Sequence, residues 1–293
     1  MSPPPTPVTT SLQTIGNTPV LHLHNIVPKA NHAKIFLKIE STNPTGSYKD
    51  RMAKAMIEQA EPCGALKPGM TVSEATGGST GSSLAFICAV KGYKFYVITS
   101  NAYAVEKTKA MRVFGTTVKL LNSPSGKITP GLFEQMSQRA REIVEAEPGR
   151  YYYTDQFNNQ DALPSAGMVM GVSQILRAKC PKTKIVVLEP ASSPLISEGR
   201  KGIHGVDGVS PGFVPPHLDN TLHDEAREIL EEEGRAMCRR LAREEGVLEG
   251  ISTGLNVVAA IQLAKELGPG KMVVTGAVID SGLKYLNGRL LSD

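Results

Sequence analysis

The sequence predicts an α/β protein with mainly parallel sheets and helices on both sheet faces. Three observations point to this class. Strand-like apolar runs alternate with stretches of helical period along most of the chain. The chain has 293 residues, of which 41% are hydrophobic, enough for one large domain or two lobes. No apolar run approaches the ~20 residues of a membrane-spanning helix.

The first half of the chain alternates regularly between the two element types. The run KIFLKIE (34–40) is an expected strand, and a helix is expected at 48–60 because its apolar residues share one face. Those residues are Met52, Ala53, Met56, Ile57 and Ala60. The further expected strands are 70–75, 95–100, 117–121 and 151–157, and the expected helices are 80–91, 104–114 and 132–147.

The second half contains a long Gly- and Pro-rich loop at 191–219. A strand is expected before this loop at 184–190, and a last strand ends the pattern at 271–278. Helices are expected between them at 224–245 and 254–267.

Charge and cysteine usage exclude several classes of function. The net charge of +4 is spread along the chain without a basic stripe, so we expect no nucleic-acid partner. The four cysteines form no CxxC pair and show no metal-ligand spacing, so we expect reduced thiols and no metal. The first ten residues lack the features of a signal peptide. We therefore expect a cytoplasmic protein without a membrane partner.

The stretch NPTGSYKDRMA (43–53) is the first candidate for chemistry. Ser47 and Asp50 have the spacing of a helix N-cap, which would place Lys49 in the first helical turn. The helix dipole and partial burial disfavour an ammonium there and favour a nucleophilic amine suited to Schiff-base formation. From the spacing alone, an ordinary surface lysine near a helix cap is the more common case.

The stretch SEATGGSTGSSLA (73–85) is the second candidate. Its glycines, hydroxyls and expected helix start would form a nest of backbone N–H groups that suits a carboxylate or a phosphate. It is neither a Walker loop nor a GxGxxG motif. The alternative is an ordinary tight turn between a strand and a helix.

Six stretches, taken together and in this order, resemble the cysteine synthase and cystathionine beta-synthase family of pyridoxal-phosphate enzymes. They are IGNTPV (15–20), LKIESTNPTGSYKDRMA, SEATGGSTGSSLA, TDQFNNQDA, GISTGLNVVAA and VIDSGLKYL, and they cover nearly the whole chain. The resemblance implies the fold of the tryptophan synthase β subunit, with two lobes. Residues 44–145 would form the smaller lobe, and residues 1–43 with 146–293 the larger one. It also implies a homodimer.

The resemblance assigns a role to each motif. Lys49 would form the Schiff base with pyridoxal 5'-phosphate, and Ser281 would face the pyridine nitrogen of this cofactor. The residues that would hold the carboxylate of a small amino-acid substrate are Thr76, Gly78, Ser79, Thr80 and Gln156.

The activity implied is β-replacement or β-elimination on a serine-type amino acid, with sulfide as one possible nucleophile. Lys49 would take the α-proton as general base. Two alternatives stay open: a non-catalytic relative, and a dehydratase that makes a keto acid from serine or threonine. One departure from the family pattern is Ser79, which replaces an asparagine that normally reaches the ring oxygen of the cofactor. This loop marks a side branch of the family, so the usual substrate is not implied.

A second departure lies between Asn159 and the helix that follows it. In the family, a helix, a central strand and a glycine-rich phosphate loop come after this turn. Here only 160–163 precede Pro164, too few residues for a parallel crossover. By comparison, roughly 25–30 residues are absent, about one helix–strand unit. The remnant of the phosphate loop that would contact the cofactor consists of Ser165, Ala166, Gly167 and Met168. We expect the neighbouring strands to be left with unpaired edges.

Overall fold

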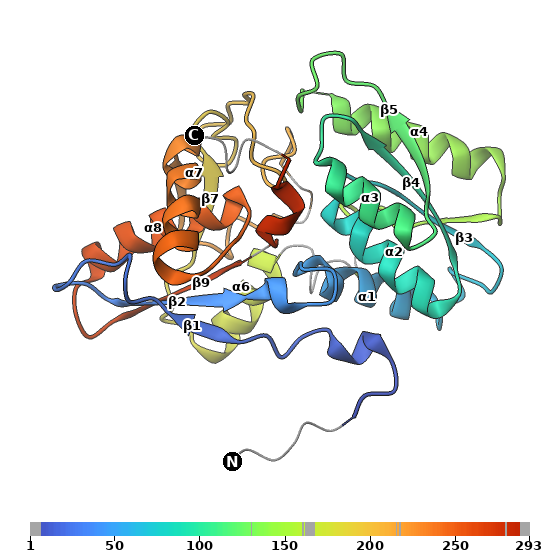
Figure 1. Ribbon diagram of the computed structural model, residues 1–293. Coiled ribbons are helices and arrows are strands. Elements are labelled where there is room, and N and C mark those ends of the chain that lie inside the picture. Colours follow the sequence, from blue (N-terminus) through green and yellow to red (C-terminus); the bar gives the residue numbers. More distant parts are fainter. Residues whose placement is uncertain are drawn as a thin grey trace.

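The computed structural model describes residues 7–129, 131–159, 161, 168–214, 216, 218–278 and 280–287. Two groups of sheets and helices lie side by side in Figure 1. We call the group on the right of Figure 1 the small lobe and the group on the left the large lobe. The α/β class predicted from the sequence is confirmed.

The small lobe is built on one parallel sheet with the strand order β5-β4-β3-β6. Helices α1 to α3 lie on one face and α4 on the other, because alternate residues of β3 and β4 enter two separate apolar cores. The strands are β3 (Thr71–Ala75), β4 (Lys94–Ser100), β5 (Thr117–Leu121) and β6 (Tyr151–Tyr153). The helices are α1 (Lys49–Ala60), α2 (Ser79–Lys91), α3 (Val105–Val113) and α4 (Leu132–Ala146).

The large lobe contains two separate sheets. One has the order β1-β2-β9, with β2 and β9 parallel, and the other pairs β7 with β8 in parallel. Helix α8 packs against strands of both sheets. The strands are β1 (Val20–His22), β2 (Lys34–Ile39), β7 (Val186–Pro190), β8 (Glu225–Ile229) and β9 (Met272–Val278). The helices are α6 (Met168–Lys179), α7 (Glu231–Arg240) and α8 (Ile251–Leu267), with short helical turns η1 (Ser11–Thr14), η2 (Glu40–Thr42), η4 (Leu241–Glu245) and η5 (Gly282–Tyr285).

Two sequence-based expectations on the elements were wrong, and one strand was missed. The helix expected at 224–245 starts only at Glu231, because the preceding residues form β8 against β7. The strand expected at 151–157 ends at Tyr153, where Asp155 adopts a positive φ of 43°. Strand β1 was not expected. The position of the lobe boundary at 145/146 stays a prediction, although β6 pairs with β3 in the small lobe.

Two of the outer strand edges in the large lobe, those of β9 and β7, lie where the sequence leads us to expect a missing strand. Among the described residues, no strand pairs with β9 on the side away from β2, or with β7 on the side away from β8. On β9, Met272 and Val274 are 68% and 65% exposed, whereas Val273 between them is buried in the core. Val172 and Ile175 of α6 are also exposed. This arrangement agrees with the sequence-based expectation that a helix–strand unit is missing after Asn159.

Candidate active site

Lys49 is the first residue of α1, as its spacing predicts. The Ser47 hydroxyl accepts the Lys49 backbone N–H at 3.3 Å, although the residue at the N-cap is Tyr48 and not the expected Ser47. The expected partner Asp50 turns back to the preceding loop, where its carboxylate accepts the Thr45 N–H at 2.8 Å. The buried apolar face of α1 anchors this turn in the small-lobe core exactly where the periodicity placed it.

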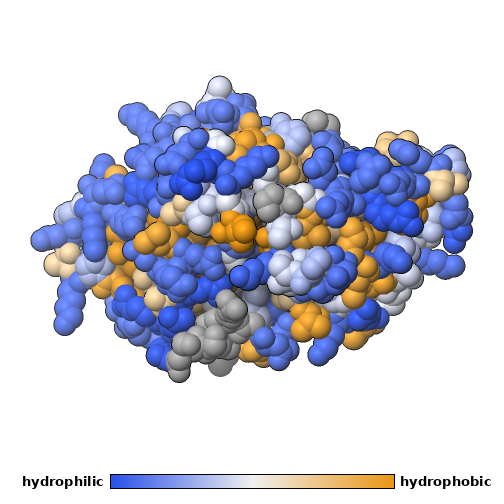
Figure 2. Space-filling model, turned by 90° about the horizontal axis from the view of Figure 1, so that it is seen from above, coloured by the Kyte–Doolittle hydropathy of each residue, from blue (hydrophilic) through white to orange (hydrophobic). Residues whose placement is uncertain are grey.

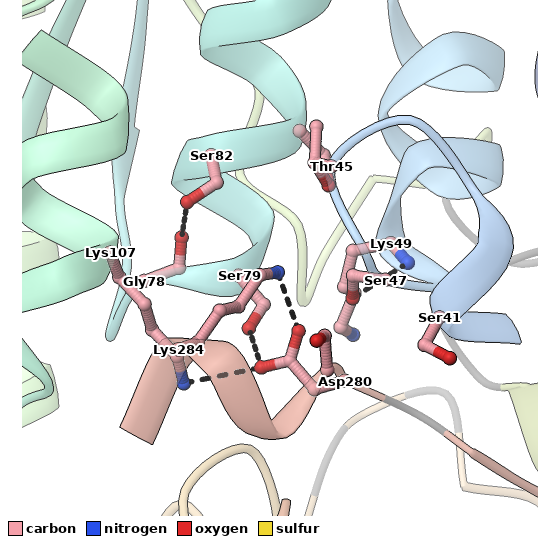
Figure 3. A network of polar contacts seen from close by, with 12 residues as sticks. Ser41, Thr45, Ser47, Lys49, Gly78, Ser79, Ser82, Lys107, Asp280 and Lys284 are labelled. Atoms are coloured by element: carbon pink, nitrogen blue, oxygen red, sulfur yellow. Dashed lines mark hydrogen bonds and ion pairs between the residues drawn. The ribbon is translucent and has the colours of Figure 1, made fainter. Parts of the chain in front are cut away.

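The Lys49 side chain is half-buried, and no carboxylate of the described residues contacts its amine. The Nζ atom lies 4.0 Å from the Met52 sulfur and 4.6 Å from the centroid of the Tyr48 ring. Neither contact neutralises an ammonium. The side chain therefore offers a primary amine at the start of a helix, beside the loop that carries Ser47 (Figure 3).

The expected carboxylate loop lies between β3 and α2. The Thr76 hydroxyl accepts the Gly78 N–H at 3.1 Å, and the Thr80 hydroxyl donates to the Gln156 side-chain oxygen at 2.7 Å. Gln156 also donates from its amide to the Ala75 carbonyl at 3.2 Å. The structure thus brings Gln156 next to the loop of Thr76, Gly78 and Thr80, although it lies 76 positions after Thr80 in the sequence. Their role in holding a substrate carboxylate stays a prediction.

Two glycines in this loop are required by the neighbouring side chains. A Cβ atom on Gly77 would lie 2.5 Å from the Tyr103 ring, and one on Gly78 would lie 2.3 Å from the Lys107 side chain. Gly78 also has a φ of +141°, which other residues rarely adopt. Close packing against α3 and its preceding turn therefore accounts for both glycines, in addition to the anion nest that the sequence suggests.

Ser281 lies next to the loop that leads to Lys49. Its backbone N–H donates to the Gly46 carbonyl at 2.9 Å, and Ser47 pairs with Asp280 in an isolated antiparallel bridge. A Cβ atom on Gly46 would approach the Ser281 side chain to 3.2 Å. The two segments expected to contact the same cofactor therefore lie against each other.

Ser79, the residue that departs from the family pattern, makes a contact that the sequence did not indicate. Its hydroxyl donates to the Asp280 carboxylate at 2.6 Å. Asp280 accepts a further hydrogen bond from the Lys284 ammonium at 2.6 Å (Figure 3). It also accepts one from the Tyr285 hydroxyl at 2.8 Å. The hydroxyl of Ser79 is thereby directed to the large lobe.

Lys107 of α3 completes this contact between the lobes. It is 3% exposed, and its ammonium lies 3.0 Å from the Asp207 carboxylate and 3.4 Å from that of Asp280. It also donates to the Tyr285 hydroxyl at 2.8 Å. We call Ser79, Lys107, Asp207, Asp280, Lys284 and Tyr285 the interlobe network.

The charges in the interlobe network stabilise one another. Burial alone would raise the pKa of Asp280, but the ammonium groups of Lys107 and Lys284 outweigh it and hold this pKa below its ordinary value. Burial would likewise lower the pKa of Lys107, but the Asp207 carboxylate, Tyr285 and Asp280 raise it well above its ordinary value. Both groups are therefore ionised at neutral pH.

A buried carboxyl, Glu74, supports the Gln156 side of the site. It accepts the backbone N–H of Gln156 at 3.1 Å, and the Thr154 hydroxyl lies 2.6 Å from it. Burial raises the pKa of Glu74 to about 8, despite these hydrogen bonds. The Thr154 hydroxyl also lies 3.1 Å from the Ser73 carbonyl and has only one proton, so a protonated Glu74 satisfies both contacts.

The phosphate-loop prediction falls mostly outside the described residues. Ser165, Ala166 and Gly167 lie outside them, as does Pro164. Met168 is the first residue of α6, and its side chain lies 3.4 Å from the position that a Cβ atom on Gly276 of β9 would take. The start of α6 is thus next to β9.

Sequence reasoning missed Lys107, Asp207, Asp280 and Tyr285. For Lys107 a signal exists, because it precedes the buried Met111 by one helical turn and so shares the apolar face of α3. Asp280 directly precedes the identified Ser281. Asp207 lies in the long loop, where no periodicity indicates burial.

The described residues fit the aldehyde and the ring of pyridoxal phosphate, whereas residues 165–167, expected at its phosphate, lie outside the described part of the chain. The cofactor aldehyde requires a primary amine, which Lys49 offers at a helix start. The cofactor ring requires a small turn such as the one at Gly46, which lies against Ser281. The amino-acid carboxylate requires hydroxyl and amide groups like those of the carboxylate loop. Lys49, Gly46, Ser281 and the Thr76–Gln156 cluster lie within adjoining segments.

Comparisons with known proteins agree with this site. The sequence profile of the family described as "Pyridoxal-phosphate dependent enzyme" matches residues 11–163 and 162–277, so the two matched segments meet where the sequence suggests missing residues. The cysteine synthase of Staphylococcus aureus (strain N315) is 36% identical over 307 aligned positions, which cover 98% of both chains. Those positions outnumber the 293 residues of this chain, so part of that relative has no counterpart here.

Solved structures of similar proteins share the fold. The structure of cysteine synthase from Entamoeba histolytica has a TM-score of 0.91 and 28% identity, and the match covers 100% of this chain and 93% of that one. A hydrogen sulfide-producing enzyme from Fusobacterium nucleatum has a TM-score of 0.87 and 33% identity, with 95% of this chain and 100% of that chain covered. The chain therefore belongs to the pyridoxal-phosphate dependent enzymes of the cysteine synthase family.

Proposed function

We propose that the chain catalyses β-replacement on a serine-type amino acid, with sulfide as the nucleophile and cysteine as the product. The observation that carries this proposal is the placement of the Lys49 amine at a helix start, in segments that adjoin Ser281 and the carboxylate loop. The identity to a cysteine synthase over nearly the full chain supports the same reaction.

Each residue of the site has a task in this reaction. Thr76, Thr80 and Gln156 bind the substrate carboxylate and orient the amino acid. The Lys49 amine takes the α-proton as general base. Pyridoxal phosphate, when bound, delocalises the charge that this proton leaves behind. The Ser281 hydroxyl would face the ring nitrogen of the bound cofactor and, being uncharged, would not keep a proton there.

Product analysis with and without sulfide tests this function. The purified chain is loaded with pyridoxal phosphate and given O-acetyl-L-serine. We expect cysteine when sulfide is present, and no product from a Lys49→Ala variant prepared in the same way. A keto acid as the main product in the presence of sulfide, or no product at all, would contradict the proposal.

We further propose that the enzyme works as a cytoplasmic homodimer. No helix within the described residues is long and apolar enough to cross a membrane. Light scattering coupled to size exclusion should give twice the mass of the chain, and a mass of one chain would contradict the dimer.

A further inference from the structure

Glu74 is a fully buried acid that holds the turn carrying Gln156. It is the next-to-last residue of β3, and none of its surface is exposed. Its Oε2 atom accepts the backbone N–H of Gln156 at 3.1 Å and lies 2.6 Å from the Thr154 hydroxyl. Between these two residues, Asp155 has a φ of 43°, a conformation that residues other than glycine rarely adopt. The Glu74 side chain therefore fixes a strained turn from both of its ends.

The same acid also sets the Gln156 side chain. The other carboxyl oxygen of Glu74, Oε1, accepts the Ala75 N–H at 2.8 Å. The Ala75 carbonyl in turn accepts the Gln156 side-chain amide at 3.2 Å, and the Gln156 side-chain oxygen accepts the Thr80 hydroxyl at 2.7 Å. Gln156 and Thr80 are two of the residues proposed to bind the substrate carboxylate. Glu74 can therefore act on the carboxylate site through Gln156, without contacting the substrate.

The hydrogen bonds around Glu74 are complete only when it carries a proton. The Ser73 carbonyl and Glu74 both lie within hydrogen-bond distance of the Thr154 hydroxyl, at 3.1 and 2.6 Å, and this hydroxyl has one proton to donate. If Glu74 donates its own proton to the Thr154 oxygen, Thr154 donates to Ser73 and both contacts are satisfied. An ionised Glu74 would compete with Ser73 for one proton and leave an acceptor unpaired.

The surroundings of Glu74 also favour its neutral form. Burial raises its pKa to about 8, and the Asp155 carboxylate adds to the rise, although three hydrogen bonds oppose it. Two tyrosines of β6, Tyr152 and Tyr153, also interact with Glu74, and burial raises the pKa of both, so they are uncharged near pH 8. Arg141 of α4 interacts with Tyr153. Glu74 therefore changes its charge near pH 8.

We propose that Glu74 is a positioning residue whose proton controls how tightly the chain binds the carboxylate of its amino-acid substrate. This inference rests on the proposed function and deepens it. With Glu74 neutral, Gln156 and Thr80 keep their arrangement, and Glu74 adds no negative charge to the site. With Glu74 ionised, a buried negative charge lies next to Gln156 and repels the incoming carboxylate. Binding should therefore be tight below about pH 8 and weaken above it.

Linkage requires the converse effect as well. If the neutral form of Glu74 favours the bound carboxylate, the bound carboxylate must raise the pKa of Glu74 by the same factor. When the substrate binds above about pH 8, Glu74 should take up a proton from solution. Both sides of this equilibrium can be measured.

The first experiment titrates the loaded enzyme with L-alanine from about pH 6.5 to about pH 9.5, a range centred on the pKa of Glu74. L-alanine has the carboxylate and amine of the substrate but no β-substituent to lose. In Glu74→Gln the side chain is neutral at every pH. Because both proteins share the ionisation of L-alanine and of the cofactor, the ratio of their Kd values isolates Glu74. We expect the Kd of the unsubstituted chain, divided by that of Glu74→Gln, to rise roughly tenfold across this range, a usual size of coupling between sites.

Glu249→Gln is the matched control. Glu249 is a second buried acid, 5% exposed, and burial raises its pKa to about 8 as well. Its carboxyl accepts the Ser41 hydroxyl at 2.7 Å, and its backbone pairs with Ser281 in an isolated bridge. Its contacts thus lie at Ser41 and Ser281 instead of Gln156. This variant should keep the pH dependence of the L-alanine Kd that the unsubstituted chain shows.

Infrared spectroscopy gives a readout that needs no substitution of Glu74. In the Glu249→Gln background, the carbonyl band of protonated carboxylic acids should lose one component as the pH rises, with a midpoint near 8 that belongs to Glu74. Saturating L-alanine should move this midpoint up by roughly one pH unit, the counterpart of a tenfold coupling. If Glu74→Gln does not fold, this midpoint alone decides.

Two results would overturn the inference: a Kd ratio that stays constant with pH, or an infrared midpoint that L-alanine does not move. A constant loss of affinity in Glu74→Gln would assign Glu74 to the support of the fold only. In either case the proposed function stands if the chain still makes cysteine from O-acetyl-L-serine and sulfide. A chain that neither binds L-alanine nor makes cysteine would contradict both.

Discussion

A single residue, Lys107, joins the two lobes. Its ammonium lies between the carboxylates of Asp207 and Asp280, with less than a tenth of the side chain exposed. A buried charge is tolerated only when such partners surround it. Because Asp280 also accepts from Ser79, the same charge fixes the end of the carboxylate loop.

Removing the Lys107 charge should therefore destabilise the protein strongly. We expect Lys107→Met to lower the free energy of unfolding by about 3–5 kcal/mol, because Asp207 and Asp280 are left without their cation. Urea unfolding of the variant measures this loss. The double variant Lys107→Met with Asp280→Asn should lose less than the sum of the two single losses. Additive losses would show that the two residues do not interact.

Glu74 gives the protein a stability that depends on pH. Its pKa is about 4.5 when unfolded and about 8 when folded, so between these values the folded chain holds more protons than the unfolded chain. The free energy of unfolding should then fall as pH rises from about 4.5 to about 8, by up to about 1.4 kcal/mol per pH unit for this group. Urea unfolding of Glu74→Gln at several pH values should show a slope that is flatter by that amount. An unchanged slope would mean that Glu74 is ionised in the folded protein.

At this scale the sequence indicated the residues of the motifs but not their partners. Lys49, Thr80, Gln156 and Ser281 could be named because they lie in recognisable stretches at strand and helix ends. Glu249 could not be distinguished from the surface acids around it, because its burial depends on a bridge to Ser281, far along the chain. Contacts of this kind are fixed by tertiary packing and leave no local pattern.

At the scale of elements, the two separate sheets of the large lobe are the main departure from a continuous parallel sheet. Periodicity predicted most helices and strands within one or two residues, since buried faces dominate those segments. It failed at 225–229, where charged residues with helix propensity form β8. Pairing with β7 decides the structure there, and a single stretch of sequence does not contain that information.

The free energy of unfolding of two variants tests whether the exposed face of β9 is covered by anything else. Met272 is 68% exposed, whereas Ile35 on the neighbouring strand is fully buried in the large-lobe core. We expect Ile35→Ala to cost about 2–5 kcal/mol in unfolding free energy. Met272→Ala should change it by less than about 0.5 kcal/mol. A large loss from Met272→Ala in urea unfolding would show that another part of the protein or a second copy covers this face.

At the scale of the whole molecule, the candidate active site is assembled from both lobes although the large-lobe sheet is divided. The small lobe supplies Lys49, the carboxylate loop and Lys107. The large lobe supplies Ser281 and Asp280. Figure 2 shows apolar side chains along the boundary between the lobes among a largely hydrophilic surface. The interlobe network joins the two lobes at this boundary.

The central claim is that this site still binds pyridoxal phosphate through Lys49. The direct measurement is to incubate the purified chain with pyridoxal phosphate, remove the unbound cofactor, reduce with borohydride and map the labelled peptide. We expect retained visible absorption and one label, on Lys49, and no retained absorption in Lys49→Ala. Loss of all absorption on desalting, or a label scattered over surface lysines, would contradict the claim and leave a family member that has lost its cofactor.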